Sequence, residues 1–175
     1  IVKRRAAKAL ARIRPEGWKY VTETLCRAKP AEFRLLGFHG VIETRSEEGY
    51  DLIVSLCTPL INSEEYASLM GKTAALLSGH ENEKVVNLLV EMCGGAEIVS
   101  VQASVALGKS LSKAAVGKVI DALLADKGSK SEMLKKALAS ATADGVGEAL
   151  VARLSAPGAD FAKIMAVIGL RKNPR

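Results

Sequence analysis

Two ladders of apolar residues recur along the whole chain at a nearly constant interval, and no other feature constrains its fold as strongly. The rungs of the first ladder lie 31, 36, 30, 31 and 32 residues apart: Leu10, Val41, Leu77, Leu107, Leu138 and Leu170. The rungs of the second ladder lie between them, 31, 36, 32 and 30 residues apart: Leu25-Cys26, Leu56-Cys57, Met92-Cys93, Leu124-Ala125 and Leu154-Ser155. Both ladders lengthen by about five residues at one step, which predicts a single insertion between Cys57 and Leu77. A fixed interval of this size indicates a repeat protein.

The segments that carry the rungs have the pattern of short helices. In the first of them an apolar face of period 3.6 lies opposite a basic face, with Val2, Ala6, Ala9, Leu10 and Ile13 on one side and Arg4, Lys8 and Arg12 on the other. Proline, glycine and polar turn residues separate about eleven such helices, and short connections make neighbouring helices antiparallel. No segment alternates with period 2. The sequence therefore predicts an all-α fold, an α-solenoid of stacked antiparallel helical hairpins.

The ladders divide the chain into one domain over 1–175 that begins with half a repeat. The predicted repeats cover residues 1–14 (the half repeat), 15–45, 47–78, 80–111, 113–142 and 144–172. The first residue is Ile1, inside a helical pattern, so we expect the chain to be a fragment or a processed product. No apolar run reaches the length needed to cross a bilayer.

The three cysteines occupy one equivalent position, directly after the large residue of the second ladder. Later copies carry Ala125 and Ser155 there, which indicates a small, nearly buried slot. A structural role is thus expected for these thiols, in preference to redox chemistry or metal binding. Unpaired cysteines also favour a reducing, cytoplasmic location.

The formal net charge of +6 is unevenly distributed. Residues 1–35 carry ten Lys and Arg against three Asp and Glu, residues 36–100 carry three against ten, and residues 101–175 carry twelve against six. A protein that follows nucleic acid along its length needs an unbroken basic stripe. The acidic middle third makes nucleic acid a less favoured partner.

Two segments, Val2–Leu10 and Val101–Gly108, resemble the second-helix pattern of HEAT repeats, specifically the short, alanine-rich repeats of bilin-lyase-type HEAT proteins. The likeness extends over nearly the whole chain, although the third and sixth copies depart from the pattern. It implies a scaffold that binds other proteins on a concave face built from the second helix of each pair. It also leaves two enzymatic alternatives, a DNA-glycosylase-like protein and a subunit of a bilin lyase.

The positions two and six residues before each rung of the first ladder are predicted to face outward on the second helices. They are Arg4 and Lys8, Leu35 and His39, Gly71 and Ala75, Val101 and Val105, Glu132 and Lys136, and Ile164 and Ile168. Because the middle copies are apolar or small, we expect a groove with an apolar floor that accepts a helix or an extended peptide. The alternative is that these side chains pack between neighbouring repeats.

A basic ridge at helical spacing, formed by Arg4, Lys8 and Arg12 with Lys3 and Arg5 nearby, predicts a partner with an acidic segment. The alternative is an ordinary solvated helix face. The predicted binding residues are drawn from the groove and the ridge: Arg4, Lys8, Arg12, Leu35, His39, Val101, Val105, Lys136 and Ile164.

Residue patterns that carry catalysis or bind cofactors are not apparent. Neither His39 nor His80 has a metal-ligand spacing with another donor, and no glycine-rich phosphate loop follows a strand. The single tryptophan, Trp18, falls on a first helix, away from the face that a glycosylase would use. We therefore expect a non-catalytic protein–protein interaction scaffold without metal or cofactor.

Overall fold

The computed structural model describes residues 2–141, 145–155 and 160–172 of the chain. Every regular element in these ranges is helical, which confirms the all-α fold class. The elements follow in this order: α1 (Val2–Arg12), α2 (Glu16–Lys19), η1 (Tyr20–Leu25), α3 (Ala31–Ile42), α4 (Glu47–Cys57), η2 (Thr58–Leu60), η3 (Glu64–Tyr66), α5 (Ala67–Leu76), α6 (Glu83–Met92), α7 (Glu97–Ser110), α8 (Lys113–Ala125), α9 (Lys130–Ser140), α10 (Val146–Leu154) and α11 (Phe161–Lys172).

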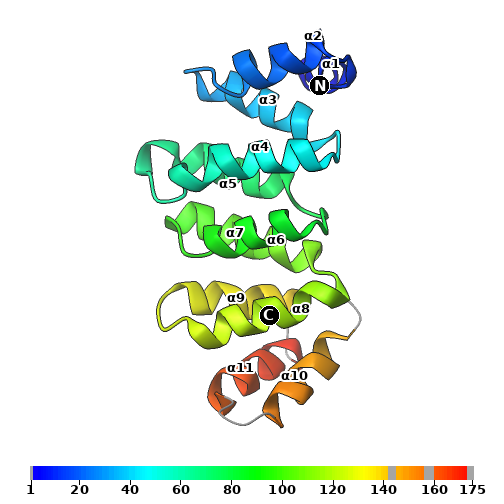
Figure 1. Ribbon diagram of the computed structural model, residues 1–175. Coiled ribbons are helices and arrows are strands. Elements are labelled where there is room, and N and C mark those ends of the chain that lie inside the picture. The colour runs from blue at the N-terminus through cyan, green and yellow to red at the C-terminus, as the bar shows by residue number, and fades with distance from the viewer. Residues whose placement is uncertain (1, 142–144, 156–159, 173–175) are drawn as a thin grey trace.

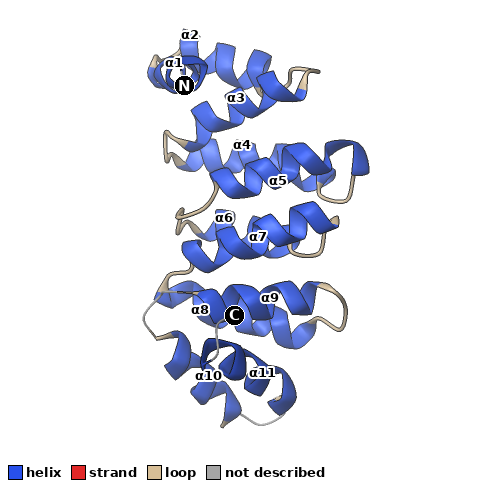
Figure 2. Cartoon of the chain, turned by 180° about the vertical axis from the view of Figure 1, so that it is seen from behind, coloured by secondary structure: helices blue, strands red, loops and turns tan. Residues whose placement is uncertain are grey.

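The helices are stacked in pairs along one long direction, with α1 near one end and α10 and α11 at the other (Figures 1 and 2). The odd-numbered helices pack on one another in chain order, from α1 against α3 to α9 against α11. The even-numbered helices α4, α6, α8 and α10 contact one another in the same order. We call the odd-numbered row the second-helix layer, because each of its members from α3 onward closes a pair.

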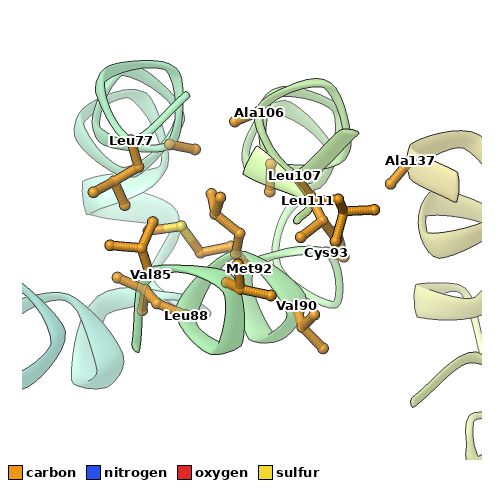
Figure 3. Close-up of a cluster of buried hydrophobic side chains, with 14 of the residues drawn as sticks. Leu77, Val85, Leu88, Val90, Met92, Cys93, Ala106, Leu107, Leu111 and Ala137 are labelled. Carbon is orange, nitrogen blue, oxygen red and sulfur yellow. The ribbon is translucent and has the colours of Figure 1, made fainter. Parts of the chain in front are cut away.

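The core lies between the two rows of helices. In its middle, Met92 of α6 extends toward the space between Leu77, which follows α5, and Leu107 of α7 (Figure 3). All three side chains are fully buried. Each pair therefore buries its apolar residues against the adjacent pair as well as within itself, as in repeat proteins generally.

The first ladder marks this core correctly until its last rung. Val41, Leu77, Leu107 and Leu138 are fully buried, whereas Leu170 is 43% exposed. In the last helix the buried residues are instead Ile164 and Val167. The true rung is the half-buried Ile168, two positions before Leu170, so the register of the sixth repeat was wrong.

The predicted insertion corresponds to the connection between α4 and α5. Nine residues, 58–66, join these helices and form the two short turns η2 and η3, whereas four residues, 93–96, join α6 to α7. The added turns lie beyond the ends of α4 and α5, at one side of the stack of helices (Figure 1). The repeat interval can therefore lengthen without disturbing the core.

Helix α4 begins at Glu47, where the Ser46 hydroxyl accepts a hydrogen bond from the Gly49 amide at 3.1 Å and caps the helix. Ser63 makes no such capping bond, and α5 begins only after the narrow turn η3.

Helix α1 packs on α3 through its smallest residues. Ala7 and Ala11 are buried. Of the face predicted to be apolar, Leu10 is half-buried against the core, whereas Val2, Ala6, Ala9 and Ile13 are exposed. A methyl group added at Gly40 of α3 would meet the carbonyl oxygen of Ala7 at 2.8 Å. Only small residues allow this approach, so the close contact between the helices decides which face of α1 is buried.

The three cysteines are buried as the second ladder predicts, but the equivalent positions of the last two copies are not, because Ala125 and Ser155 are exposed. Cys26, Cys57 and Cys93 are free thiols, each no more than 1% exposed. Burial raises the pKa of each thiol to about 12. Thiolate chemistry at neutral pH is thereby suppressed, which agrees with a structural role.

Candidate functional site

A hollow of about 490 Å³ opens on the second-helix layer between α1, α3 and α5. Helix α3 lies between α1 and α5 and supplies the floor of the hollow, which includes Phe33, Leu35 and Leu36. Phe33 is 48% exposed, and Leu35 and Leu36 are half-buried. Ala75 and Leu76 of α5 extend this apolar lining. An open, mainly apolar hollow of this volume is of the size that binds ligands.

A second hollow of about 270 Å³ continues the first toward α7. Lys72 and Ala75 line both hollows, and Ile98 and Gln102 of α7 close the second one. Beyond them, Val101 and Val105 extend the exposed apolar surface of α7 at helical spacing, with Ile98 53% and Val105 50% exposed. We call the two hollows together with this α7 surface the groove.

Equivalent positions of successive repeats build the groove. The residues five positions before a rung are Leu36, Lys72 and Gln102, and all three line it. The residues nine positions before a rung are Glu32, Ser68 and Ile98, and these line it as well. Because the helices repeat, one stripe of positions produces one continuous surface across α3, α5 and α7.

Cationic side chains border the first hollow on two sides. Lys3 and Arg4 stand on the α1 side and Lys72 on the α5 side. None of the three forms a salt bridge within the described part of the chain. Glu32 is the one acidic residue that lines this hollow. The balance around the apolar floor is thus positive, and its cations are available to an anionic partner.

His39 stands on the wall of the same hollow. Desolvation lowers the pKa of its imidazole, and the nearby Arg4 and Lys8 act in the same direction against the opposing effect of Glu43. Its Nδ1 atom is buried and has no hydrogen-bond partner among the described residues. His39 is therefore a neutral, half-buried side chain at neutral pH and adds no charge to the hollow.

The three residues of the predicted basic ridge lie in different surroundings. Lys8 donates a hydrogen bond to Glu43 of α3 at 2.6 Å, and this bond lowers the pKa of the Glu43 carboxyl. Arg12 is exposed but does not line the hollow, and only Arg4 of the three reaches it. The ridge thus divides into one groove residue, one ion-paired residue and one solvated residue.

Of the remaining predicted binding residues, some are exposed as expected and one is buried. Val101 and Val105 are exposed on α7 as expected, and Lys136 is exposed on α9, beyond the two hollows. Ile164 was predicted to face outward, but it is fully buried. The two-residue error in the last register explains this, since Ala162 and Ala166 take the outward positions and both are exposed.

Several groove residues were missed from the sequence: Glu32, Phe33, Leu36, Ser68, Lys72, Leu76, Ile98 and Gln102. A signal for most of them existed. Extending the outward stripe by one more turn, to nine residues before each rung, reaches Ile98. The position five residues before each rung, next to the predicted position at six, reaches Lys72. No comparable pattern marks Phe33.

The other aromatic and histidine side chains serve the interior. His80 is buried, and its Nδ1 lies 2.9 Å from the hydroxyl oxygen of Tyr50 in a hydrogen bond. Trp18 is 9% exposed and is covered by the Arg14 guanidinium, 3.9 Å from the ring centroid. The Trp18 ring is therefore not available to stack on a nucleic-acid base. Within residues 2–141, 145–155 and 160–172, no three His, Cys, Asp or Glu side chains are grouped to hold a metal ion.

Comparisons with known proteins add no relative to this description. No protein-family model, no curated protein and no solved structure matches the chain. None of the described helices is long and apolar enough to span a bilayer. The surface itself therefore provides the evidence for function.

Proposed function

We propose that this chain is a non-catalytic scaffold of HEAT type that binds another protein along its second-helix layer. The observation that carries the proposal is the groove, where Phe33, Ile98 and Val105 remain about half exposed on three parts of one surface. Exposed apolar side chains that form a continuous, hollowed surface are typical of protein-binding sites. The three buried cysteines are not joined in disulfides, which supports a reducing, cytoplasmic setting.

A helix or an extended segment of a partner suits this surface best. The groove crosses several helices of the layer, so a partner that lies along it can contact equivalent positions of successive repeats. Burial of each large apolar side chain contributes about 1.5–3 kcal/mol. The resemblance of Val2–Leu10 and Val101–Gly108 to HEAT repeats supports the same use of the layer.

Affinity capture with a matched pair of variants tests the proposal. The double variant Ile98→Asp/Val105→Asp places charges in the groove, and Val151→Asp on α10 is the control, since Val151 is 58% exposed outside the second-helix layer. Circular dichroism first establishes that both variants are folded. Capture from a lysate of the source organism, with and without nuclease, then compares the proteins retained.

We expect a discrete protein that survives nuclease and is retained by the wild type and by Val151→Asp but lost by the double variant. If only nucleic acid is retained, with an affinity that falls steeply as salt rises, the scaffold proposal is wrong and the nucleic-acid-binding alternative is supported. A protein retained equally by all three forms would place binding outside the groove.

A further inference from the structure

The hollow between α1, α3 and α5 combines an apolar floor with cations on two opposite sides. We infer that it binds an acidic peptide segment in which a bulky apolar residue is flanked by carboxylates on both sides, an inference that rests on the function proposed above. The apolar residue occupies the hollow over Phe33, Leu35 and Leu36. The carboxylates pair with Lys3 and Arg4 on one side and with Lys72 on the other.

The volume and the apolar lining of the hollow indicate which kind of residue lies at the centre of the bound peptide segment. The hollow of about 490 Å³ is open enough to admit a leucine or an aromatic side chain from solvent. Phe33 offers an exposed ring against which such a side chain packs. A buried anchor of this kind, surrounded by polar contacts, is the usual energetic centre of a peptide interface.

The arrangement of charge selects the residues on either side of the anchor. Lys3, Arg4 and Lys72 form no salt bridge among the described residues, so binding them breaks no internal ion pair. Elsewhere, Lys8 and Lys84 are paired with Glu43 and Asp51. Glu32 repels a carboxylate only locally, against three cations. Complementary charge of this kind mainly increases specificity and the association rate.

Other anionic ligands fit the hollow less well. A fatty acid or a single phosphate has its charge at one point, whereas the cations here stand on α1 and on α5, with α3 between them. A nucleic-acid strand needs a continuous basic track, and residues 36–100 carry ten acidic against three basic residues. A peptide supplies separate carboxylates on both sides of an apolar anchor. It can also continue over Ile98 and Val105.

Selection from a library of random twelve-residue peptides displayed on phage tests the inference. A fluorescein-labelled synthetic peptide of the selected consensus is then titrated against three proteins by fluorescence polarisation: the wild type, the double variant Arg4→Glu/Lys72→Glu, and the control Lys136→Glu. Arg4, Lys72 and Lys136 are all exposed, so these substitutions leave the core intact. The control changes the same charge on the same layer outside both hollows.

We expect selected peptides with Asp or Glu on both sides of a leucine or an aromatic residue. Their affinity should fall at least tenfold with Arg4→Glu/Lys72→Glu and less than twofold with Lys136→Glu. Selected peptides without acidic residues, or binding insensitive to the charge reversal, would overturn the inference. If such peptides were still lost with Ile98→Asp/Val105→Asp, the proposed function would stand alone. If no selected peptide depended on either set of groove substitutions, both proposals would fail.

Discussion

At the scale of single residues, the buried polar side chains need specific hydrogen-bond partners within the core. Tyr50 and His80 come from different repeats, and they meet in a hydrogen bond of 2.9 Å and an edge-to-face contact with ring centroids 5.8 Å apart. A buried hydrogen bond contributes about 1 kcal/mol, and an orphaned partner costs about 1–3 kcal/mol. The contact between Tyr50 and His80 therefore joins α4 to the connection between α5 and α6.

The first prediction concerns the pH dependence of this contact. Desolvation, followed by the charge of Arg45, lowers the pKa of His80 below its usual value of 6.5. The unfolded chain therefore takes up the proton first as the pH falls. The stability contributed by neutral His80 is complete above about pH 6.5 and decreases as the pH falls toward the lowered pKa of the folded state.

Urea unfolding followed by circular dichroism at pH 7.5 and pH 5.5 measures this effect. His80→Ala should destabilise the protein by about 1–3 kcal/mol at pH 7.5 and reduce the loss of stability on acidification. His39, whose pKa is also lowered, contributes in the same direction. A His39→Gln/His80→Ala variant is therefore the control, and equal pH dependence in this variant and the wild type would refute the explanation.

The second prediction concerns the three thiols. Because burial raises the pKa of Cys26, Cys57 and Cys93 to about 12, they should react with Ellman's reagent at least about a hundredfold more slowly in the folded protein than in urea. The absorbance of the released thiolate measures both rates. Rapid modification of one thiol in the native protein would show that its slot opens.

At the scale of helices, glycine and alanine at the crossings set the spacing of the second-helix layer. A methyl group at Gly40 would meet the Ala7 carbonyl oxygen at 2.8 Å, and one at Gly108 would meet the Ala137 carbonyl oxygen at 3.0 Å. These contacts are to backbone, which cannot move aside as a flexible side chain can. Close packing of this layer therefore depends on the absence of a β-carbon at particular positions.

The third prediction compares two glycine substitutions within helices. Gly40→Ala should destabilise the protein by about 1–3 kcal/mol through overpacking against α1. Gly117→Ala in α8 has nothing within 4 Å of the added methyl group and should stabilise the protein by about 0.5–1 kcal/mol through helix propensity. Chemical unfolding measures both. Equal effects of the two substitutions would mean that α1 and α3 are not in close contact.

The sequence was sufficient to predict the helical class, most of the first ladder and the burial of the three cysteines, but not the exposure of Ala125 and Ser155 at the equivalent position. Val41, Leu77 and Leu107 could be found because a repeated apolar position has to be buried in every copy. Ile164 could not be placed, since Ile168 and Leu170 are both plausible rungs in a helix that is apolar on several sides. The hollow over Phe33 depends on how α1, α3 and α5 pack together. The residue pattern of one helix gives no information about this packing.

At the scale of the whole molecule, burial is concentrated in the middle of the stack. Six of the ten residues of α6 are buried, whereas α1 and α10 bury two residues each. A helix at an end of a repeat stack contacts one adjacent pair in place of two. Stability is therefore expected to decrease toward both ends.

The fourth prediction follows from this gradient. Native-state hydrogen exchange should be slowest for the amides of α6 and α7 and faster for those of α1 and α10, because the end helices open without unfolding the middle. Mass spectrometry of peptic fragments resolves these segments. Uniform exchange along the chain would instead indicate a single cooperative unit.

The central claim is that a partner protein binds in the groove, and site-specific photo-crosslinking tests it most directly. A photoreactive phenylalanine analogue is placed at Phe33, at Val105 and, as a control outside the second-helix layer, at Val151, all of them exposed positions. We expect Phe33 and Val105 to be crosslinked to the same protein and Val151 to give no such product. Crosslinking of that protein from Val151 alone, or of nucleic acid from the groove positions, would contradict the account.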